Sequence, residues 1–176
     1  MRRAPGAGGG VVLDILVHNA DLLRFLLGRD PLSIQTRTQH NGLGGAAAGP
    51  DAPEDGAMSL IAFEGGLLAQ THESFVAAHA ATRLHVLGTQ GTLYAVGSLT
   101  QEGTAELWQR DARGERPIPL PPVDLYAAGF SAFIEACAGR GQPLSSGIDG
   151  AWALATALAG LRAAAAGAAM PVRLPL

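Results

Sequence analysis

The spacing of hydrophobic and polar positions changes several times along the chain, and each change predicts an element. Apolar residues recur at helical spacing from about residue 14 to Leu27, and Gly28 follows where a glycine commonly ends a helix. Two further helical patterns cover residues 124–138 and 148–166. The second of these is rich in alanine, a strong helix former, and is expected to be a buried amphipathic helix.

Between the first and second helices, short apolar stretches separated by turn residues predict strands. The predicted strands cover residues 32–39, 57–63, 67–76, 84–87, 92–96 and 105–109, and a short one covers 172–174. Because their connections are short, neighbouring strands should be antiparallel. Strands in one block with helices at both ends predict an α+β fold, an open, predominantly antiparallel β-sheet with helices packed on one face. Residues 1–176 are long enough for a single domain with its own core.

Composition and charge exclude several classes of function. The net charge of −3 provides no basic surface for nucleic acid or an anionic membrane. All 12 basic residues are arginine, so no lysine of this chain can act as an acid, a base or a Schiff-base former. The lone Cys137 rules out an internal disulfide and is expected to be a buried, inert thiol. The apolar stretch 151–169 is mostly alanine and carries Arg162, which indicates a buried helix rather than a membrane span.

The start of the chain carries the most informative pattern, a glycine run followed by an acid and a histidine. Gly8, Gly9 and Gly10 allow the backbone to approach another surface closely. Asp14 and His18 are four residues apart, so on a helix they share one face. A carboxylate beside an imidazole can handle a proton, with His18 as general base and Asp14 as its support. The alternative is structural, with Asp14 favoured by the helix dipole and His18 as an ordinary helix-face residue.

Other motifs are weaker. Residues 42–47 fit a dinucleotide-binding glycine pattern, but a proline-containing loop follows where a helix would have to hold the pyrophosphate. His40, His72, His79 and His85 lie on different predicted strands and loops without metal-ligand spacing, so no metal site is expected. His72 is followed by a glutamate, and the two should lie on opposite faces of one strand.

The ordered set of motifs resembles the C-terminal substrate domain of the glucose–fructose oxidoreductase / inositol dehydrogenase (Gfo/Idh/MocA) family. The resemblance covers nearly the whole chain. It is carried by the glycine run with Asp14 and His18, by Glu54-Asp55, by Phe63-Glu64-Gly65-Gly66, by Gly88-Thr89-Gln90-Gly91-Thr92-Leu93, by Gly139-Arg140 with Pro143, and by Ser146-Gly147-Ile148-Asp149-Gly150.

The resemblance implies hydride transfer between NAD or NADP and the carbinol carbon of a sugar, an inositol or a related polyol. His18 would accept the hydroxyl proton, Asp14 would support His18, and Gly8 to Gly10 would pass near the nicotinamide and substrate. Leu16 stands where the family often has glycine. The family's N-terminal Rossmann domain and its Glu-Lys-Pro segment have no counterpart here. NAD or NADP is therefore expected to bind only together with that domain, and the chain alone should be inactive.

The resemblance leaves other residues and partners open. Asp21 and Asp149 match frequent family positions and are interpreted as structural, whereas Arg37, His72 and Arg83 are candidate substrate contacts. A cytoplasmic protein is expected, with a small sugar or polyol substrate, no nucleic-acid or membrane partner, and a homo-oligomer formed through the sheet. The alternatives are a non-enzymatic ligand-binding or dimerisation module, and a half-enzyme completed by a separate nucleotide-binding subunit.

Overall fold

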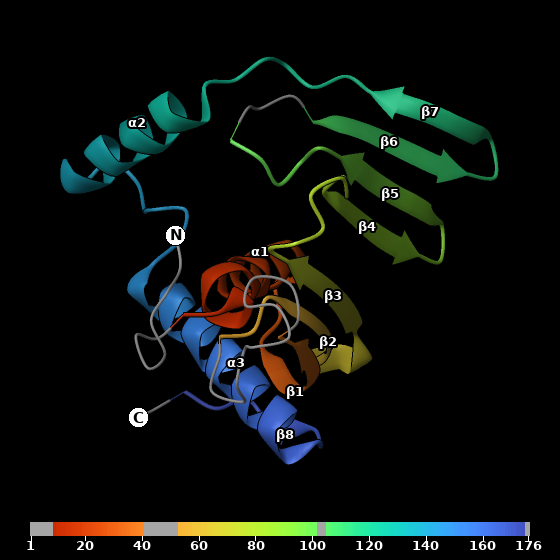
Figure 1. Cartoon of the computed structure of the whole chain (residues 1–176). Helices are drawn as coiled ribbons and strands as arrows, with labels where there is room; N and C mark the ends of the chain where they lie inside the picture. The colour runs from red at the N-terminus through yellow and green to blue at the C-terminus, as the bar shows by residue number, and fades with distance from the viewer. Residues whose placement is uncertain (1–8, 41–52, 102–104, 175–176) are drawn as a thin grey trace. The chain divides into compact units, whose positions relative to one another are not determined.

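The computed structural model describes residues 9–40, 53–101 and 105–174 (Figure 1). Internal contacts divide the chain into two compact units, Met1–Ala78 with Ser145–Leu176, and His79–Leu144. Every strand pairing that the structure describes is antiparallel. The predicted α+β class is confirmed, and the described strands form two four-stranded sheets.

The sheet of the first unit has the strand order β3-β2-β1-β8. Its strands are β1 (Pro31–Gln39), β2 (Gly56–Phe63), β3 (Leu68–Ser74) and the short β8 (Met170–Pro171). Burial alternates along β2, so one face of the sheet is covered and the other is exposed. β8 lies slightly before the strand expected at 172–174, and Val172 follows it as a buried residue.

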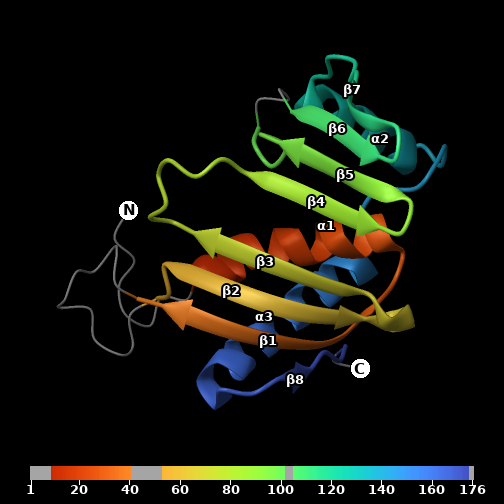
Figure 2. The same ribbon diagram turned by 90° about the vertical axis from the view of Figure 1, so that its right-hand side faces the viewer.

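Helices cover one face of this sheet, where α1 (Val17–Leu27) and α3 (Gly147–Ala166) lie against β1 to β3 (Figure 2). A short π-helical segment, η1 (Val12–Leu16), leads directly into α1. The core between helices and sheet consists of Val11, Val12, Leu16, Ile34, Ala57, Ile61, Phe63, Ala155, Ala157, Ala159 and Val172. Small residues let α3 approach closely: a Cβ on Gly160 would lie 3.2 Å from Thr36 Oγ1 and 3.4 Å from Ile34 Cδ1 and Leu16 Cδ2.

The helix ends are fixed by local chemistry. Gly28 ends α1 with φ 59°, as predicted, because glycine adopts the left-handed conformation without strain. Ser146 and Asp149 form a capping box at the start of α3. Asp149 also pairs with Arg24, whose Nε donates to Asp30 Oδ1 at 2.7 Å. This pairing ties the end of α1 to the start of α3 and supports the structural interpretation of Asp149.

The second unit contains an antiparallel meander in the order β4-β5-β6-β7. Its strands are β4 (Arg83–Gly88), β5 (Gly91–Val96), β6 (Glu106–Asp111) and β7 (Gly114–Ile118). β7 was not predicted, because Pro117 argues against a strand. The structure accommodates Pro117 because β7 is an edge strand, so the missing N–H is not needed by a neighbour on its outer side.

The helix α2 (Leu125–Cys137) follows this meander, and the Asp124 side chain accepts a hydrogen bond from the Ala127 N–H at 2.9 Å. Its large apolar side chains are exposed: Leu125, Phe130, Phe133 and Ile134. Cys137 is likewise exposed rather than buried. In the first unit, a short 3-10 helix, η3 (Glu64–Gly66), makes the turn between β2 and β3. In the described part of the chain, no helix is both long and apolar enough to cross a membrane.

Candidate active site

The helical stretch formed by η1 and α1 presents Asp14 and His18 to solvent. Val12, Leu16 and Ala20 of the same stretch are buried in the core. Asp14 and His18 are exposed. Asp14 and His18, which the sequence analysis paired by their spacing, are therefore both accessible to solvent. Both lie on a helical stretch that is anchored in the core.

A π-helical turn, η1, contains Asp14 and ends two residues before His18. The Asp14 N–H donates to the carbonyl of Gly10, four residues back, at 3.0 Å. The Val17 N–H donates to the carbonyl of Val12, which is five residues back. The turn therefore contains one more residue than a regular α-helical turn, a feature often found at functional sites. Asp14 lies within this wide turn, and His18 follows it in the first turn of α1.

Glu54 stabilises the start of η1 from the loop before β2. Its backbone carbonyl accepts from the Val11 N–H at 2.9 Å, and its Oε1 accepts from the Val12 N–H at 3.0 Å. A negative charge at a helix N-terminus is favourable, and only 8% of Glu54 is exposed. Glu54 thus satisfies two backbone donors that the helix itself leaves unpaired, one with its backbone carbonyl and one with its carboxylate.

The glycine run makes room for this carboxylate. A Cβ on Gly10 would overlap the carboxyl carbon and both oxygens of Glu54. Gly9 has φ 85°, a conformation that glycine adopts without strain. Gly8 lies outside the described residues. The packing of Glu54 therefore requires glycine at position 10, and this role was not predicted from the sequence. The approach of the glycine run to a nicotinamide stays a prediction.

A second buried carboxyl group lies beside α1. Glu73 on β3 is 2% exposed, and its Oε1 accepts from Asn19 Nδ2 at 2.8 Å. Its other oxygen, Oε2, is buried and has no hydrogen-bond partner among the described residues. Burial raises the pKa of Glu73, because a buried carboxylate loses its hydration. No sequence pattern pointed to this pair, since its members are 54 positions apart.

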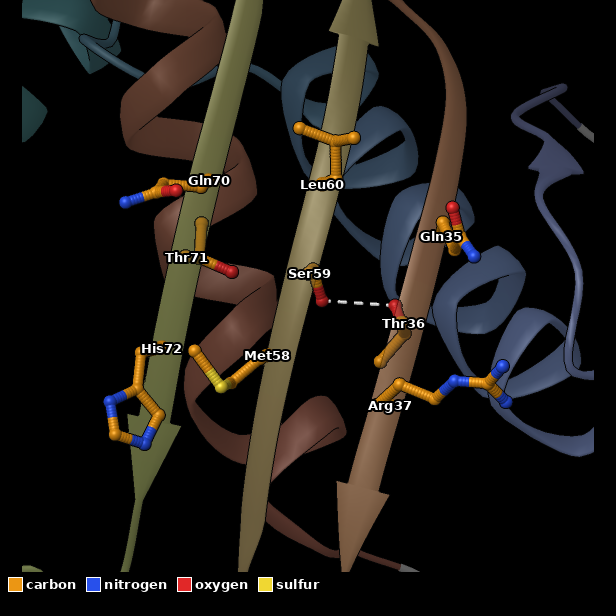
Figure 3. A pocket seen from close by; sticks show the side chains of 9 residues that line it. All are labelled: Gln35, Thr36, Arg37, Met58, Ser59, Leu60, Gln70, Thr71 and His72. Carbon is orange, nitrogen blue, oxygen red and sulfur yellow. Dashed lines mark hydrogen bonds between the residues drawn. The ribbon is translucent and has the colours of Figure 1, made fainter.

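The outer face of the first sheet contains two of the three candidate substrate contacts. Figure 3 views this face with the helices behind the strands, and Arg37 and His72 project from it. His72 is exposed and Glu73 is buried, so their predicted placement on opposite faces is confirmed. The sheet therefore separates Arg37 and His72 from the helix that carries His18. Arg83 lies on β4 in the other unit.

The exposed face forms a shallow hollow lined by apolar and polar side chains (Figure 3). Its lining residues are Gln35, Thr36, Arg37, Met58, Ser59, Leu60, Gln70, Thr71 and His72. The Thr36 and Ser59 hydroxyls are 2.9 Å apart and bond to each other within the sheet. Among the described residues, no group of three His, Cys, Asp or Glu side chains has the geometry of a metal site. The glycine-rich residues 42–47 lie outside the described part of the chain.

Comparison with known proteins identifies relatives of this chain. The model of the GFO/IDH/MocA C-terminal domain matches residues 1–94. The chain is 42% identical over 168 residues to 1,5-anhydro-D-fructose reductase of Ensifer adhaerens, covering 96% of this chain and 49% of that protein.

Solved structures share the fold. Aldose-aldose oxidoreductase from Caulobacter crescentus, complexed with glycerol, matches 94% of this chain and 48% of its own, with TM-score 0.80 and 21% identity. UDP-N-acetylglucosamine 3-dehydrogenase from Acidithiobacillus ferrooxidans matches 89% of this chain and 47% of its own, with TM-score 0.75 and 20% identity. The chain thus spans about half the length of these relatives.

Proposed function

Because this chain belongs to the GFO/IDH/MocA family, we propose that it is the substrate-bearing half of an NAD(P)-dependent oxidoreductase. The reaction proposed is the interconversion of a hydroxyl and a carbonyl group on a sugar, an inositol or a related polyol. The observation that carries the proposal is the exposed pair Asp14 and His18 on a helical stretch that Val12, Leu16 and Ala20 anchor in the core.

His18 is the proton acceptor in this proposal. During oxidation of an alcohol, the hydroxyl proton must leave as the carbinol hydrogen departs as hydride, and a neutral imidazole can take that proton near pH 7. In the reverse direction the protonated imidazole returns it. Asp14, one turn earlier, supports the imidazolium electrostatically and helps to orient the substrate hydroxyl. The chain has no lysine to replace either residue.

The nicotinamide cofactor supplies the hydride chemistry, and the described residues do not form a site to hold it. Dinucleotide sites of the Rossmann type need a parallel βαβ unit, with the pyrophosphate at a helix N-terminus. The pairings that the structure describes are all antiparallel. The helix N-terminus that precedes His18, at the start of η1, already holds the Glu54 carboxylate. We therefore assign NAD or NADP binding to the part of the relatives that this chain does not span.

The names of two relatives support a substrate class. The Ensifer adhaerens protein is named for a sugar ketone, 1,5-anhydro-D-fructose, and the Caulobacter crescentus protein for aldoses. At 42% identity over most of this chain, the first is the better guide. We propose a cyclic sugar or anhydro-sugar carbonyl as the group that is reduced.

A hybrid enzyme tests this function. The matching half of the Ensifer adhaerens reductase is replaced by this chain, and oxidation of NADPH or NADH is followed with 1,5-anhydro-D-fructose and with a panel of ketoses and aldoses. The proposal expects substrate-dependent turnover by the hybrid and none by the 176-residue chain alone. A hybrid that binds the nucleotide but turns over no sugar would contradict the proposal. So would nucleotide-dependent turnover by the isolated chain.

We also propose that the outer face of the first sheet joins two copies of the chain. Met58, Leu60 and Leu68 project from it and are 62%, 48% and 70% exposed. Large apolar side chains exposed together on one sheet face are typical of an interaction surface, and sheet faces pack readily on one another. Sedimentation should show a dimer that Leu60→Glu dissociates, whereas Leu87→Glu on the other sheet leaves it intact. A monomeric wild type would refute this assembly.

A further inference from the structure

The carboxyl group of Glu73 is buried where a charged residue is unusual. It lies on the helix-covered face of β3, paired in register with Ala57 of β2. Only 2% of the residue is exposed. A buried polar group of this kind is costly unless it is hydrogen-bonded, so its place in the fold calls for an explanation.

The contact that Glu73 makes leads directly to the candidate site. Its Oε1 accepts from the side-chain amide of Asn19 at 2.8 Å, and Asn19 follows His18 in the first turn of α1. The bond therefore ties the helix to the sheet one residue beyond the proposed proton acceptor. Oε2 remains buried and has no hydrogen-bond partner in the described part of the chain, so Glu73 is not satisfied by this bond alone.

The π turn explains why such a tie matters here. Successive residues of an α-helix are about 100° apart around the axis, so one extra residue in a turn rotates everything that follows by about that angle. The wide turn formed by η1 contains Asp14 and ends two residues before His18. If it relaxed to a regular turn, the part of the helix that carries His18 would rotate relative to the part that carries Asp14. The hydrogen bond of Asn19, three residues after the end of this turn, holds the rotation of α1.

We infer that Asn19 and Glu73 form a positioning pair that holds the wide turn and so sets the direction of His18 relative to Asp14. This inference rests on the proposed role of His18 in proton transfer. Neither member of the pair touches the reacting atoms. Their effect on the reaction comes through the orientation of the helix, and small errors of orientation lower catalytic rates strongly.

Three variants separate positioning from simple structural support. Glu73→Gln keeps an oxygen that can accept from Asn19. Glu73→Leu removes the acceptor. The double variant Asn19→Ala/Glu73→Leu removes donor and acceptor together, and replacing both partners of a buried hydrogen bond by apolar groups is often nearly neutral for stability. The double variant should therefore be folded while lacking the tie.

Two readouts are measured on these variants. The first is the side-chain amide resonance of Asn19 in the 176-residue chain, whose exchange with solvent reports the hydrogen bond without any reaction. The second is turnover in the hybrid enzyme. We expect slow amide exchange in the wild type and in Glu73→Gln, and fast exchange in Glu73→Leu. We expect kcat to fall by about 10-fold to 100-fold in the double variant, with KM changed less, and Glu73→Gln to stay within about twofold of wild type.

The possible failures are distinct. Wild-type kcat in the double variant would overturn the inference, because the tie would then be dispensable. An equal loss of kcat in Glu73→Gln and Glu73→Leu would also overturn it, because the charge rather than the hydrogen bond would matter. Rapid exchange of the Asn19 amide in the wild type would show that the bond does not persist in solution, which also refutes the inference. Full activity of His18→Asn would instead refute the proposed function, while the amide measurement would still report whether the tie exists.

Discussion

Replacing Gly10 by alanine should displace the Glu54 carboxylate and destabilise the first unit. The new Cβ would overlap the carboxyl carbon and both oxygens of Glu54, so the side chain would have to leave the start of η1. The buried bond from the Val12 N–H to Glu54 Oε1 would be lost. A hydrogen bond to a charged group contributes about 1.5–3 kcal/mol, and alanine in place of glycine returns about 0.4–1 kcal/mol through the unfolded state. The expected net loss in the free energy of unfolding is about 0.5–2.5 kcal/mol.

Unfolding must be followed in the first unit alone, because two compact units need not unfold together. The chain has two tryptophans, Trp152 on α3 of the first unit and Trp108 on β6 of the second. In a Trp108→Phe background, fluorescence during urea denaturation reports the first unit only. The free energy of unfolding is then compared between this background and the same background carrying Gly10→Ala. Gly28→Ala is not a suitable control, because Gly28 has a positive φ and alanine would be strained there.

A double-mutant cycle decides the cause. In a Glu54→Ala background the obstacle is gone, so Gly10→Ala should cost close to nothing or stabilise slightly. The difference between the two backgrounds is the coupling free energy, and it should be at least about 1 kcal/mol. An equal cost of Gly10→Ala in both backgrounds would refute the reasoning and would point to another role for the glycine.

Three further predictions concern the stability of the chain. Burial raises the pKa of Glu73, so the folded chain binds that proton more tightly than the unfolded chain does. The free energy of unfolding of the wild type, measured relative to Glu73→Gln, should therefore be highest below the ordinary glutamate pKa and should fall as the pH rises through the raised pKa. A difference between the two proteins that does not depend on pH would contradict this. Gly160→Leu should lower the free energy of unfolding by about 1–3 kcal/mol, because the larger side chain overpacks the core. Gly150→Leu should leave it unchanged, because a Cβ at this position of the same helix has open space around it. Arg24→Met should lower the free energy of unfolding by about 1 kcal/mol, because Arg24 makes two partly buried ion pairs. Arg140→Met should leave it nearly unchanged, because the ion pair of Arg140 is more exposed. Equal losses in the two variants would contradict this prediction.

Local patterns predicted most of the elements. The helix that ends at Gly28, the helix that begins near Ser146 and the strands β1 to β6 all follow from spacing, caps and turn residues close in sequence. The missed strand β7 shows where such rules fail, because Pro117 is disfavoured in a strand in general and tolerated at a sheet edge in particular. Whether a strand lies at an edge is decided by tertiary structure.

The chemistry of the candidate site was only partly visible in the sequence. Asp14 and His18 were found because they are four residues apart and follow glycines. The π turn that contains Asp14 and precedes His18 was not predicted, because nothing in the local pattern distinguishes it from an α-helical turn. Glu54 was part of a recognised motif, but its contact with Val12 joins residues 42 positions apart. Long-range contacts of buried carboxyl groups leave no periodic signal along the chain.

The central claim is that His18 transfers the substrate proton, and the most direct measurement is the turnover of the hybrid enzyme carrying His18→Asn. His79→Asn is the control, because His79 is an exposed histidine in the turn after β3 and has no role in the proposed site. We predict that kcat falls by about 10²-fold or more for His18→Asn, as is typical for loss of a general base, and stays near wild type for His79→Asn. Wild-type turnover in His18→Asn would contradict the claim and remove His18 from the mechanism.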